Sequence, residues 1–190
     1  MIDLNRSALI LVDIQNDFLP GGALAVQDGD SILEAVNALS RHPFRAVIAT
    51  QDWHPSHHCS FSSQGGPWPV HCVAGTQGAD FPEALTPEPI THIIRKGVLQ
   101  ERDSYSGFLD NDRATSTGLD GLLKGLGIDR VVVCGLALDY CVMATTLDAV
   151  SCGYQTDVVP EACLGISTDP TATLEKLEKQ GVQLKNLNAF

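Results

Sequence analysis

The sequence predicts an α/β protein of three layers, in which a mostly parallel, doubly wound sheet carries helices on both faces. Two observations predict this fold class. Short apolar runs rich in β-branched residues alternate along the 190-residue chain with stretches whose apolar side chains fall on one helical face. Such alternation needs crossover connections, which make neighbouring strands parallel and place helices over both faces of the sheet.

Five runs are candidates for the strands. Residues 8–12, 46–49 and 131–134 are continuously apolar, as strands buried on both faces must be. Residues 91–94 and 156–159 are weaker candidates, because polar residues share these runs with isoleucine or valine.

Four segments between or after these runs predict helices. Residues 31–39 and 119–126 place their leucine, isoleucine and valine side chains on one face, and a glycine ends the second of them. Residues 138–150 predict a third helix, and residues 171–180 predict a fourth that begins after a proline.

The chain is expected to form a single domain, residues 1–190, with a functional loop region at about residues 51–89. This region is rich in Pro, Gly, His and Ser and has little periodicity. A structureless segment of that length in a compact domain is usually functional or disordered. Its Trp, His and Cys content favours function, so we expect it to bind a metal ion and substrate.

Composition excludes several classes of protein. The chain has 12 Lys+Arg against 23 Asp+Glu, a net charge of −11, and no basic cluster, which argues against nucleic acid as a partner. Its apolar runs are far shorter than the ~20 residues of a membrane-spanning helix, and its start lacks a signal peptide pattern. Six cysteines without a C-x-x-C pair predict a reduced, cytoplasmic protein. A homo-oligomer stays open.

Polar or reactive residues follow four of the predicted strands. Asp13, Asp52, Lys96 and residues 135–141 each come directly after such a run or close behind it. Because ligands of parallel α/β folds bind at the carboxyl ends of the strands, we expect these residues to converge at one edge of the sheet.

Cys141 is the candidate nucleophile. It is predicted in the first turn of the helix 138–150, where free N–H groups and the helix dipole lower the pKa of a thiol. The N–H groups of Ala137 and Cys141 are candidates for an oxyanion hole. The alternative is that Cys141 is simply a small buried apolar residue.

Asp13 and Lys96 are the candidate partners of this thiol. A carboxylate at a buried strand end can accept a thiol proton if burial raises its pKa. Lys96 is then expected to hold the carboxylate and to stabilise developing negative charge. A structural Asp–Lys ion pair is the alternative.

Asp52, His54 and His71 are candidate ligands of a divalent metal ion. Residues at i and i+2 of an extended segment point to the same side, and His71 completes a set of two His and one carboxylate with open positions. Ser60 or His57 is a candidate for a further ligand or for holding a coordinated water. Solvent-exposed loop histidines are the plain alternative.

Two other sites rank lower. A closed structural zinc site would use His and Cys from residues 57–59 and 71–72, but the chain has no C-x₂₋₄-C ligand pair. A dinucleotide site at residues 125–127 lacks its third glycine and precedes a strand instead of following one. Phe18 and Trp68 remain as aromatic residues able to stack on a flat ring, with a core role as the alternative for Phe18.

Six segments, spread in order over essentially the whole chain, resemble the nicotinamidase (pyrazinamidase) family of isochorismatase-like cysteine hydrolases. They are residues 12–18, 52–55, 66–73, 95–97, 105–108 and 135–142. The resemblance implies the isochorismatase-like hydrolase fold. It also implies a cis peptide before Ala137.

The resemblance assigns a role to each candidate residue. It implies a catalytic triad of Asp13, Lys96 and Cys141, a metal site of Asp52, His54 and His71, an oxyanion hole of Ala137 and Cys141, and substrate contacts from Phe18, Trp68 and Tyr105. The position at which some relatives have a further metal-bound His is Ser60 in this chain. Relatives that act on carbamoyl compounds generally lack the metal set, and isochorismatases lack the cysteine.

The implied reaction is metal-dependent hydrolysis of nicotinamide, and of pyrazinamide, to the acid and ammonia through a cysteine thioester, in NAD salvage. Zn²⁺ is the expected ion, with Fe²⁺ or Mn²⁺ also suited to the ligand set. We expect the ion to position the pyridine ring, directly or through water, because the thiol and the oxyanion hole already serve the first step. A role in orienting the water of the second step stays open. A related small-amide hydrolase, or a non-catalytic ligand- or partner-binding relative, stays open.

Overall fold

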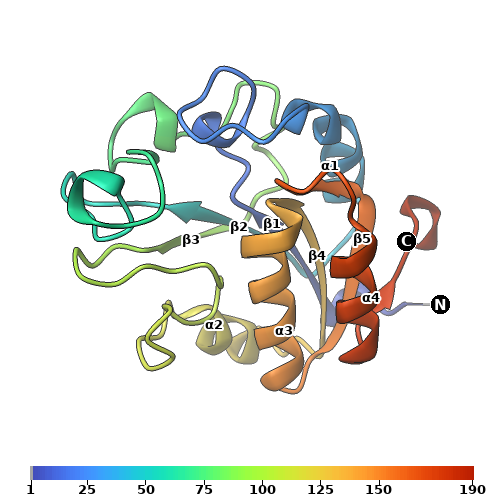
Figure 1. The fold of residues 1–190 in the computed structure, drawn as a ribbon. Helices are drawn as coiled ribbons and strands as arrows, with labels where there is room; N and C mark the ends of the chain where they lie inside the picture. The colour runs from blue at the N-terminus through green and yellow to red at the C-terminus, as the bar shows by residue number, and fades with distance from the viewer. Residues whose placement is uncertain (1) are drawn as a thin grey trace.

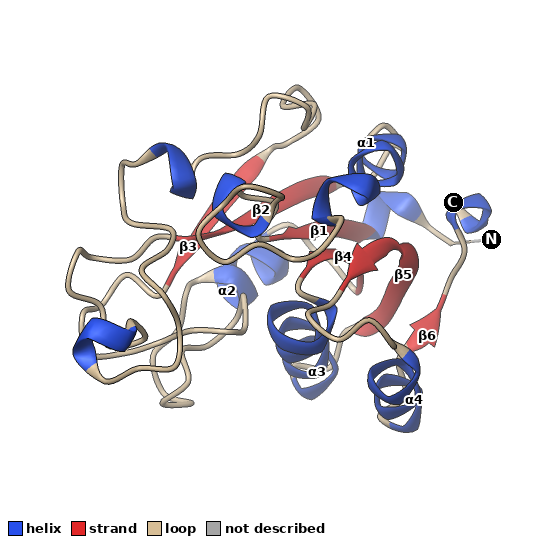
Figure 2. Cartoon of the chain, turned by 45° about the horizontal axis from the view of Figure 1, so that its top comes forward, coloured by secondary structure: helices blue, strands red, loops and turns tan. Residues whose placement is uncertain are grey.

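Six parallel strands form one sheet in the computed structural model, which describes residues 2–190. The strands are β1 (Ser7–Val12), β2 (Ala46–Asp52), β3 (His92–Lys96), β4 (Arg130–Leu136), β5 (Gln155–Leu164) and β6 (Gln183–Leu184). They lie in the order β3-β2-β1-β4-β5-β6 (Figure 1 and Figure 2). Every residue of β1 and β2 is buried, as continuous apolar runs predict.

Helices cover both faces of this sheet. They are α1 (Leu33–Ser40), α2 (Leu119–Gly125), α3 (Met143–Ser151) and α4 (Thr171–Lys179). Figure 2 shows α1 over one face and α2, α3 and α4 over the other. The predicted three-layer, doubly wound fold is therefore confirmed. No helix within residues 2–190 has both the length and the hydropathy needed to cross a membrane.

The sheet extends further than the sequence predicted at its β5 side. β5 runs for ten residues, although only residues 156–159 formed a recognisable run. Its pairing with β4 shifts register between Val133 and Gly135, and the segment of β5 passed over by this shift contains Pro160, which has no N–H for the ladder. β6 was not predicted, because two residues are too few to show a periodicity.

The predicted helix 138–150 is a regular α-helix only from Met143. Leu138–Val142 form a π-helical turn, and α3 continues directly from it. Cys141 therefore lies in a π-helical turn and not in the first turn of an α-helix. In the same way, α1 follows a 3₁₀ turn at Gly29–Ile32 and begins two residues later than predicted.

The carboxyl ends of the central strands meet at one edge of the sheet. Asp52 and Lys96 are paired neighbours at the ends of β2 and β3. Asp13 follows the last residue of β1, which is paired with Gly135 of β4. The long segment between β2 and β3 contains two short 3₁₀ turns, Ser62–Gln64 and Gln77–Ala79. Four residues predicted to converge are thus held at neighbouring strand ends or just beyond them.

Candidate active site

Lys96 lies at the centre of a buried polar cluster. Its Nζ is 2.9 Å from Asp13 Oδ2, 2.5 Å from Asp52 Oδ1 and 3.6 Å from Cys141 Sγ. It also donates a hydrogen bond of 2.8 Å to the carbonyl of Ser104. The side chains of Lys96 and Asp13 are completely buried. The structure therefore brings the three predicted triad residues together, with one metal-ligand candidate beside them.

Asp13 is held in an unusual backbone conformation. Its φ angle is +49°, in the left-handed region, which costs a non-glycine residue about 1–2 kcal/mol. Thr50 of β2 stabilises this arrangement from both sides. The backbone N–H of Asp13 donates to Thr50 Oγ1 at 3.1 Å, and the Thr50 hydroxyl donates to Asp13 Oδ1 at 2.5 Å. Such local strain is typical of functional sites.

Burial shapes the protonation of this cluster. It raises the pKa of Asp13, although Lys96 and the Thr50 hydroxyl act in the opposite direction. At Asp52 burial is the strongest influence and acts to raise the pKa, but Lys96, His54 and His71 together outweigh it and hold the pKa well below the usual range. Lys96 remains charged because Asp13 and Asp52 raise its pKa against the effect of burial.

The expected lowering of the Cys141 pKa is wrong. Burial raises the pKa of this thiol above its ordinary value, and the charges of Asp13 and Asp52 add to the effect against that of Lys96. The dipole argument placed the thiol in the first turn of an α-helix and left burial out of account, whereas Cys141 lies in a π-helical turn and is only 7% exposed. The thiol is therefore protonated at rest, and a base must remove its proton. A carboxylate oxygen of Asp13 lies within 4.8 Å of Cys141 Sγ.

The turn between β4 and α3 carries the two candidate oxyanion donors. The peptide bond between Leu136 and Ala137 is cis, as the family resemblance implied. The carbonyl of Ala137 accepts hydrogen bonds from the N–H groups of Tyr140 and Val142 at 3.0 and 3.1 Å. Ala137 and Cys141, whose N–H groups are the predicted donors, both line the same pocket.

Asp52, His54 and His71 form a compact group of possible metal ligands. One ligand atom from each lies within 4.8 Å of the others. The Nε2 atoms of His54 and His71 are 3.5 and 4.0 Å from Asp52 Oδ2. Their Nδ1 atoms are 2.9 Å from the carbonyl of Gly97 and 2.7 Å from that of Pro69. A Cβ at Gly97 would lie 2.4 Å from the His54 ring, so only glycine fits there.

This arrangement fits a divalent ion. A carbonyl bound to Nδ1 fixes the tautomer in which Nε2 is a free electron-pair donor, the usual second shell of a metal-bound histidine. His54 Nε2 is buried and has no hydrogen-bond partner among the described residues. An unpaired buried nitrogen is costly, and an ion at this position removes that cost.

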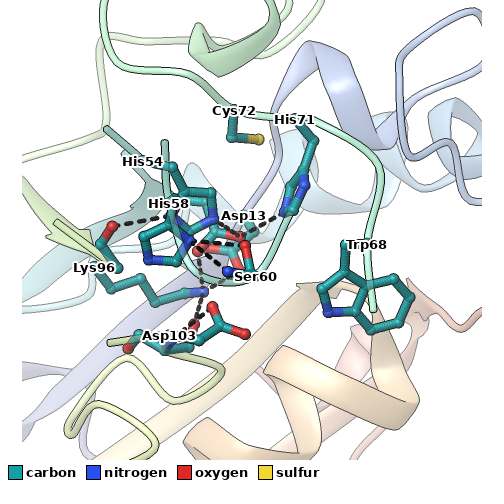
Figure 3. Close-up of polar contacts among 12 residues, drawn as sticks. Asp13, His54, His58, Ser60, Trp68, His71, Cys72, Lys96 and Asp103 are labelled. Carbon is teal, nitrogen blue, oxygen red and sulfur yellow. Dashed lines mark hydrogen bonds and ion pairs between the residues drawn. The ribbon is translucent and has the colours of Figure 1, made fainter. Parts of the chain in front are cut away.

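Within residues 2–190, His57 belongs to none of the groups of closely spaced His, Cys, Asp and Glu ligand atoms. His57 is exposed. The Ser60 hydroxyl lies 2.7 Å from His58 Nδ1, and His58 Nε2 lies 2.8 Å from the carbonyl of Arg102. His58 in turn stacks on His54, with ring centroids 4.0 Å apart (Figure 3). His58 was not predicted as a site residue, and it supports a metal-ligand candidate from behind.

The competing structural zinc site is not formed. Within residues 2–190, none of the groups of closely spaced metal-ligand atoms includes Cys59 or Cys72. Cys72 Sγ instead lies 4.0 Å from the carbonyl of Gly78.

A pocket opens above Cys141. Phe18, Trp68 and Tyr105 line it, as predicted, and Phe18 lies beside His71 with ring centroids 5.8 Å apart. Its other apolar lining residues are Leu24, Val26, Tyr140 and Ile166.

Trp68, Tyr105 and Tyr140 form an aromatic group at this pocket. Trp68 Nε1 donates to the Tyr105 hydroxyl at 3.2 Å, and the rings of Trp68 and Tyr140 meet edge to face with centroids 5.1 Å apart. Tyr140 was missed, although its position next to Cys141 was a signal. Thr50 was also missed; a hydroxyl at the end of an apolar run, opposite a candidate Asp, was the only hint of it.

Comparison with known proteins shows the family and the fold to which this chain is similar. The isochorismatase domain family matches residues 7–187. The nicotinamidase of Escherichia coli (strain K12) is 43% identical over 181 residues, covering 86% of this chain and 85% of that protein. PnC1 from L. infantum, solved in complex with nicotinate, is 43% identical with a TM-score of 0.96, covering 100% of this chain and 96% of that one. The pyrazinamidase of Pyrococcus horikoshii, solved in complex with zinc, is 40% identical with a TM-score of 0.84, covering 95% and 99%.

Proposed function

Since the chain belongs to the isochorismatase family, we propose that it is a cysteine amidohydrolase that converts nicotinamide and water to nicotinate and ammonia. One observation carries this proposal. A buried lysine contacts a carboxylate of raised pKa and a protonated thiol at the base of a pocket lined by aromatic side chains. Pyrazinamide, which has the same ring size and carboxamide, is the second expected substrate.

The first step uses Asp13 as the base. Asp13 takes the thiol proton of Cys141, and Lys96 stabilises the thiolate through its contact of 3.6 Å. The thiolate attacks the carboxamide carbon, and the N–H groups of Ala137 and Cys141 receive the negative charge of the tetrahedral oxygen. Asp13 then returns the proton to the departing nitrogen, so the C–N bond breaks and ammonia leaves a thioester behind.

The second step repeats the proton transfer with water. Asp13 accepts a proton from the water that attacks the thioester, and the C–S bond breaks to release nicotinate. The proton returns to Cys141, which restores the resting thiol. A raised pKa suits Asp13 to both directions of transfer, because its carboxylate then binds a proton more readily than an exposed one.

Asp52, His54 and His71 are the proposed holders of the metal ion, and zinc is the proposed ion. When bound, such an ion would supply a Lewis-acid site for the ring nitrogen or for water. The unpaired Nε2 of His54 supports this assignment, as does the zinc complex of the P. horikoshii pyrazinamidase. Phe18 and Trp68 are proposed to hold the faces of the ring, with Tyr105 beside Trp68.

The wider setting follows from the reaction. Nicotinate formed from nicotinamide is a precursor for NAD, so we place the activity in NAD salvage. The six cysteines are free, which supports a reducing compartment such as the cytoplasm. Residues 1–190 are proposed to act as one domain, in which residues 51–89 supply metal ligands and Trp68.

Ammonia release from nicotinamide tests the proposal. Zinc-loaded protein should release one ammonia for each nicotinate formed, and pyrazinamide should also react. If another small amide reacts far faster than either, the chain is a related amide hydrolase. If nicotinamide binds but no amide releases ammonia, the chain is a non-catalytic relative, and the proposed function is wrong.

A further inference from the structure

The loop between β5 and α4 forms part of the substrate pocket. Ile166 in this loop lines the pocket together with Leu24 and Val26, which lie in the segment between β1 and α1. Its side chain is nevertheless 47% exposed, so it stands at the mouth of the pocket and not in the core. Its position relative to a bound ring therefore depends on how the loop is held.

Asp139 holds this loop through both of its carboxylate oxygens. Oδ1 accepts the backbone N–H of Ile166 at 2.9 Å, and Oδ2 accepts the backbone N–H of Ser167 at 2.8 Å. Asp139 lies in the π-helical turn, two residues before Cys141. The same turn thus carries the candidate nucleophile and the anchor of the opposite loop.

Little else fixes the loop. A second pocket lies against it and is lined in part by Gly165, Ser167 and Thr168. Residues 166–170 are all exposed. Gly165 also packs tightly on the anchor, because a Cβ at this position would lie 2.9 Å from Asp139 Oδ1.

We propose that Ile166 is a specificity-determining residue, which limits the substituents allowed on the ring of an aromatic carboxamide, and that Asp139 is the positioning residue that holds it at the pocket. This assignment rests on the proposed amidohydrolase function. The unsubstituted six-membered ring passes under Ile166, whereas an added alkyl group on that side of the ring meets its side chain. Asp139 does not touch the substrate and acts through the loop.

The test compares nicotinamide with a panel of singly methylated nicotinamides. For Ile166→Ala, the kcat/KM of at least one methylated substrate relative to nicotinamide should rise about tenfold or more, the usual effect of one carbon in an apolar pocket. Asp139→Asn should raise the ratio for the same substrate by a smaller factor, because the amide nitrogen cannot accept an N–H. Combined with Ile166→Ala, Asp139→Asn should change the ratio by less than about twofold, since both changes act through one side chain.

Two further variants separate positioning from general damage. Gly165→Ala keeps the aspartate at position 139 but pushes its carboxylate away from the loop. Like Asp139→Asn, it should therefore raise the ratio, and for the same methylated substrate. Thr168→Ala changes the same loop without touching Asp139 or the pocket, and it should leave the ratio unchanged. Thermal unfolding of each variant shows which of them are folded.

Three results would overturn the assignment. An unchanged ratio in folded Ile166→Ala protein removes Ile166 as a specificity determinant. An Asp139→Asn or Gly165→Ala protein that loses kcat equally for all substrates, with an unchanged ratio, shows that the anchor does not act through Ile166. Unmodified protein that releases no ammonia from any amide contradicts the proposed function itself, which is a different failure from an unchanged ratio.

Discussion

The floor and the walls of the site are built in different ways. The floor consists of Asp13, Asp52 and Lys96, which end or directly follow three adjacent strands and are almost completely buried. The walls consist of Trp68, Tyr105, Tyr140 and Ile166, which come from turns and loops and are partly exposed. Backbone pairing in the sheet fixes the positions of the floor residues, whereas single side-chain contacts fix those of the wall residues.

This difference separates chemistry from recognition. Groups that move protons need fixed distances, and the strand ends provide them without any loop being ordered first. Groups that contact the ring can adjust, because loops open at a lower free energy than core strands. Substitutions in the floor should therefore act on kcat and on folding, and substitutions in the walls should act mainly on KM and on substrate choice.

The largest effect is expected at the nucleophile. Cys141→Ala should lower kcat for nicotinamide at least about 10⁴-fold, because loss of a covalent nucleophile leaves only binding and the oxyanion hole. Cys141→Ser should be nearly as inactive, and nicotinamide binding should survive both changes. Cys152→Ala, which removes an exposed thiol, is the matched control. A Cys141→Ala protein that keeps more than a few per cent of the activity rules out covalent catalysis.

The metal group shares Asp52 with the floor of the site, and loss of the group should act on binding of the ring. His71→Ala should raise KM for nicotinamide at least about tenfold, since even an outer-shell partner of a metal costs 10- to 100-fold in affinity. Zinc content should fall in parallel. His57→Ala, an exposed histidine of the same loop region, should change neither.

Benzamide sharpens this prediction because it lacks the ring nitrogen. Steady-state kinetics with unmodified protein should give a much lower kcat/KM for benzamide than for nicotinamide. Equal rates for the two amides would mean that the ion does not orient the ring.

A smaller effect is expected from Thr50, which holds Asp13 without taking part in the chemistry. Asp13 must be ionised to take the thiol proton, so kcat/KM should fall on the acid side as Asp13 becomes protonated. Burial raises the pKa of Asp13 and the Thr50 hydroxyl lowers it, so Thr50→Val raises it further. The acid limb of the pH profile should then move to higher pH.

The control for this change is Thr156→Val, which removes a buried hydroxyl of β5 that donates to the carbonyl of Tyr154. Its pH profile should match that of the unmodified protein. An acid limb that stays in place or moves to lower pH in Thr50→Val contradicts the role of Asp13 as base.

The smallest effect is expected in the walls. Trp68→Phe keeps an aromatic ring but removes the hydrogen bond to the Tyr105 hydroxyl, and Tyr105→Phe removes the same bond from the other side. Each should raise KM for nicotinamide roughly 2- to 10-fold, the worth of one hydrogen bond, with little change in kcat. The double variant should resemble either single one; fully additive losses would show that the bond does not order the wall.

The floor of the site was predictable from the sequence because its residues lie at strand ends. Continuous apolar runs marked β1, β2 and β4, and the polar residues that follow such runs had to meet at one edge of a parallel sheet. β6 was not predicted, because two residues show no periodicity. The full length of β5 was not predicted either, since Pro160 and the register shift interrupt its pattern.

The walls and supports were less predictable, because their roles arise from contacts between distant segments. Asp139 reads as a polar residue near a cysteine until the loop at Ile166 is folded against it. The same holds for Thr50, whose partner Asp13 is 37 residues away. The wrong direction for the Cys141 pKa has a related cause: the helix position was visible in the sequence, but the burial that outweighs it was not.

The central claim is that Cys141 carries the acyl group during turnover. Rapid acid quenching of the zinc-loaded protein during nicotinamide hydrolysis, followed by peptide mass analysis, tests it most directly. We predict a nicotinoyl group on Cys141 in the unmodified protein and no acylated residue in Cys141→Ala. An acyl group on a different residue, or ammonia released at the full rate by Cys141→Ala, would contradict the account.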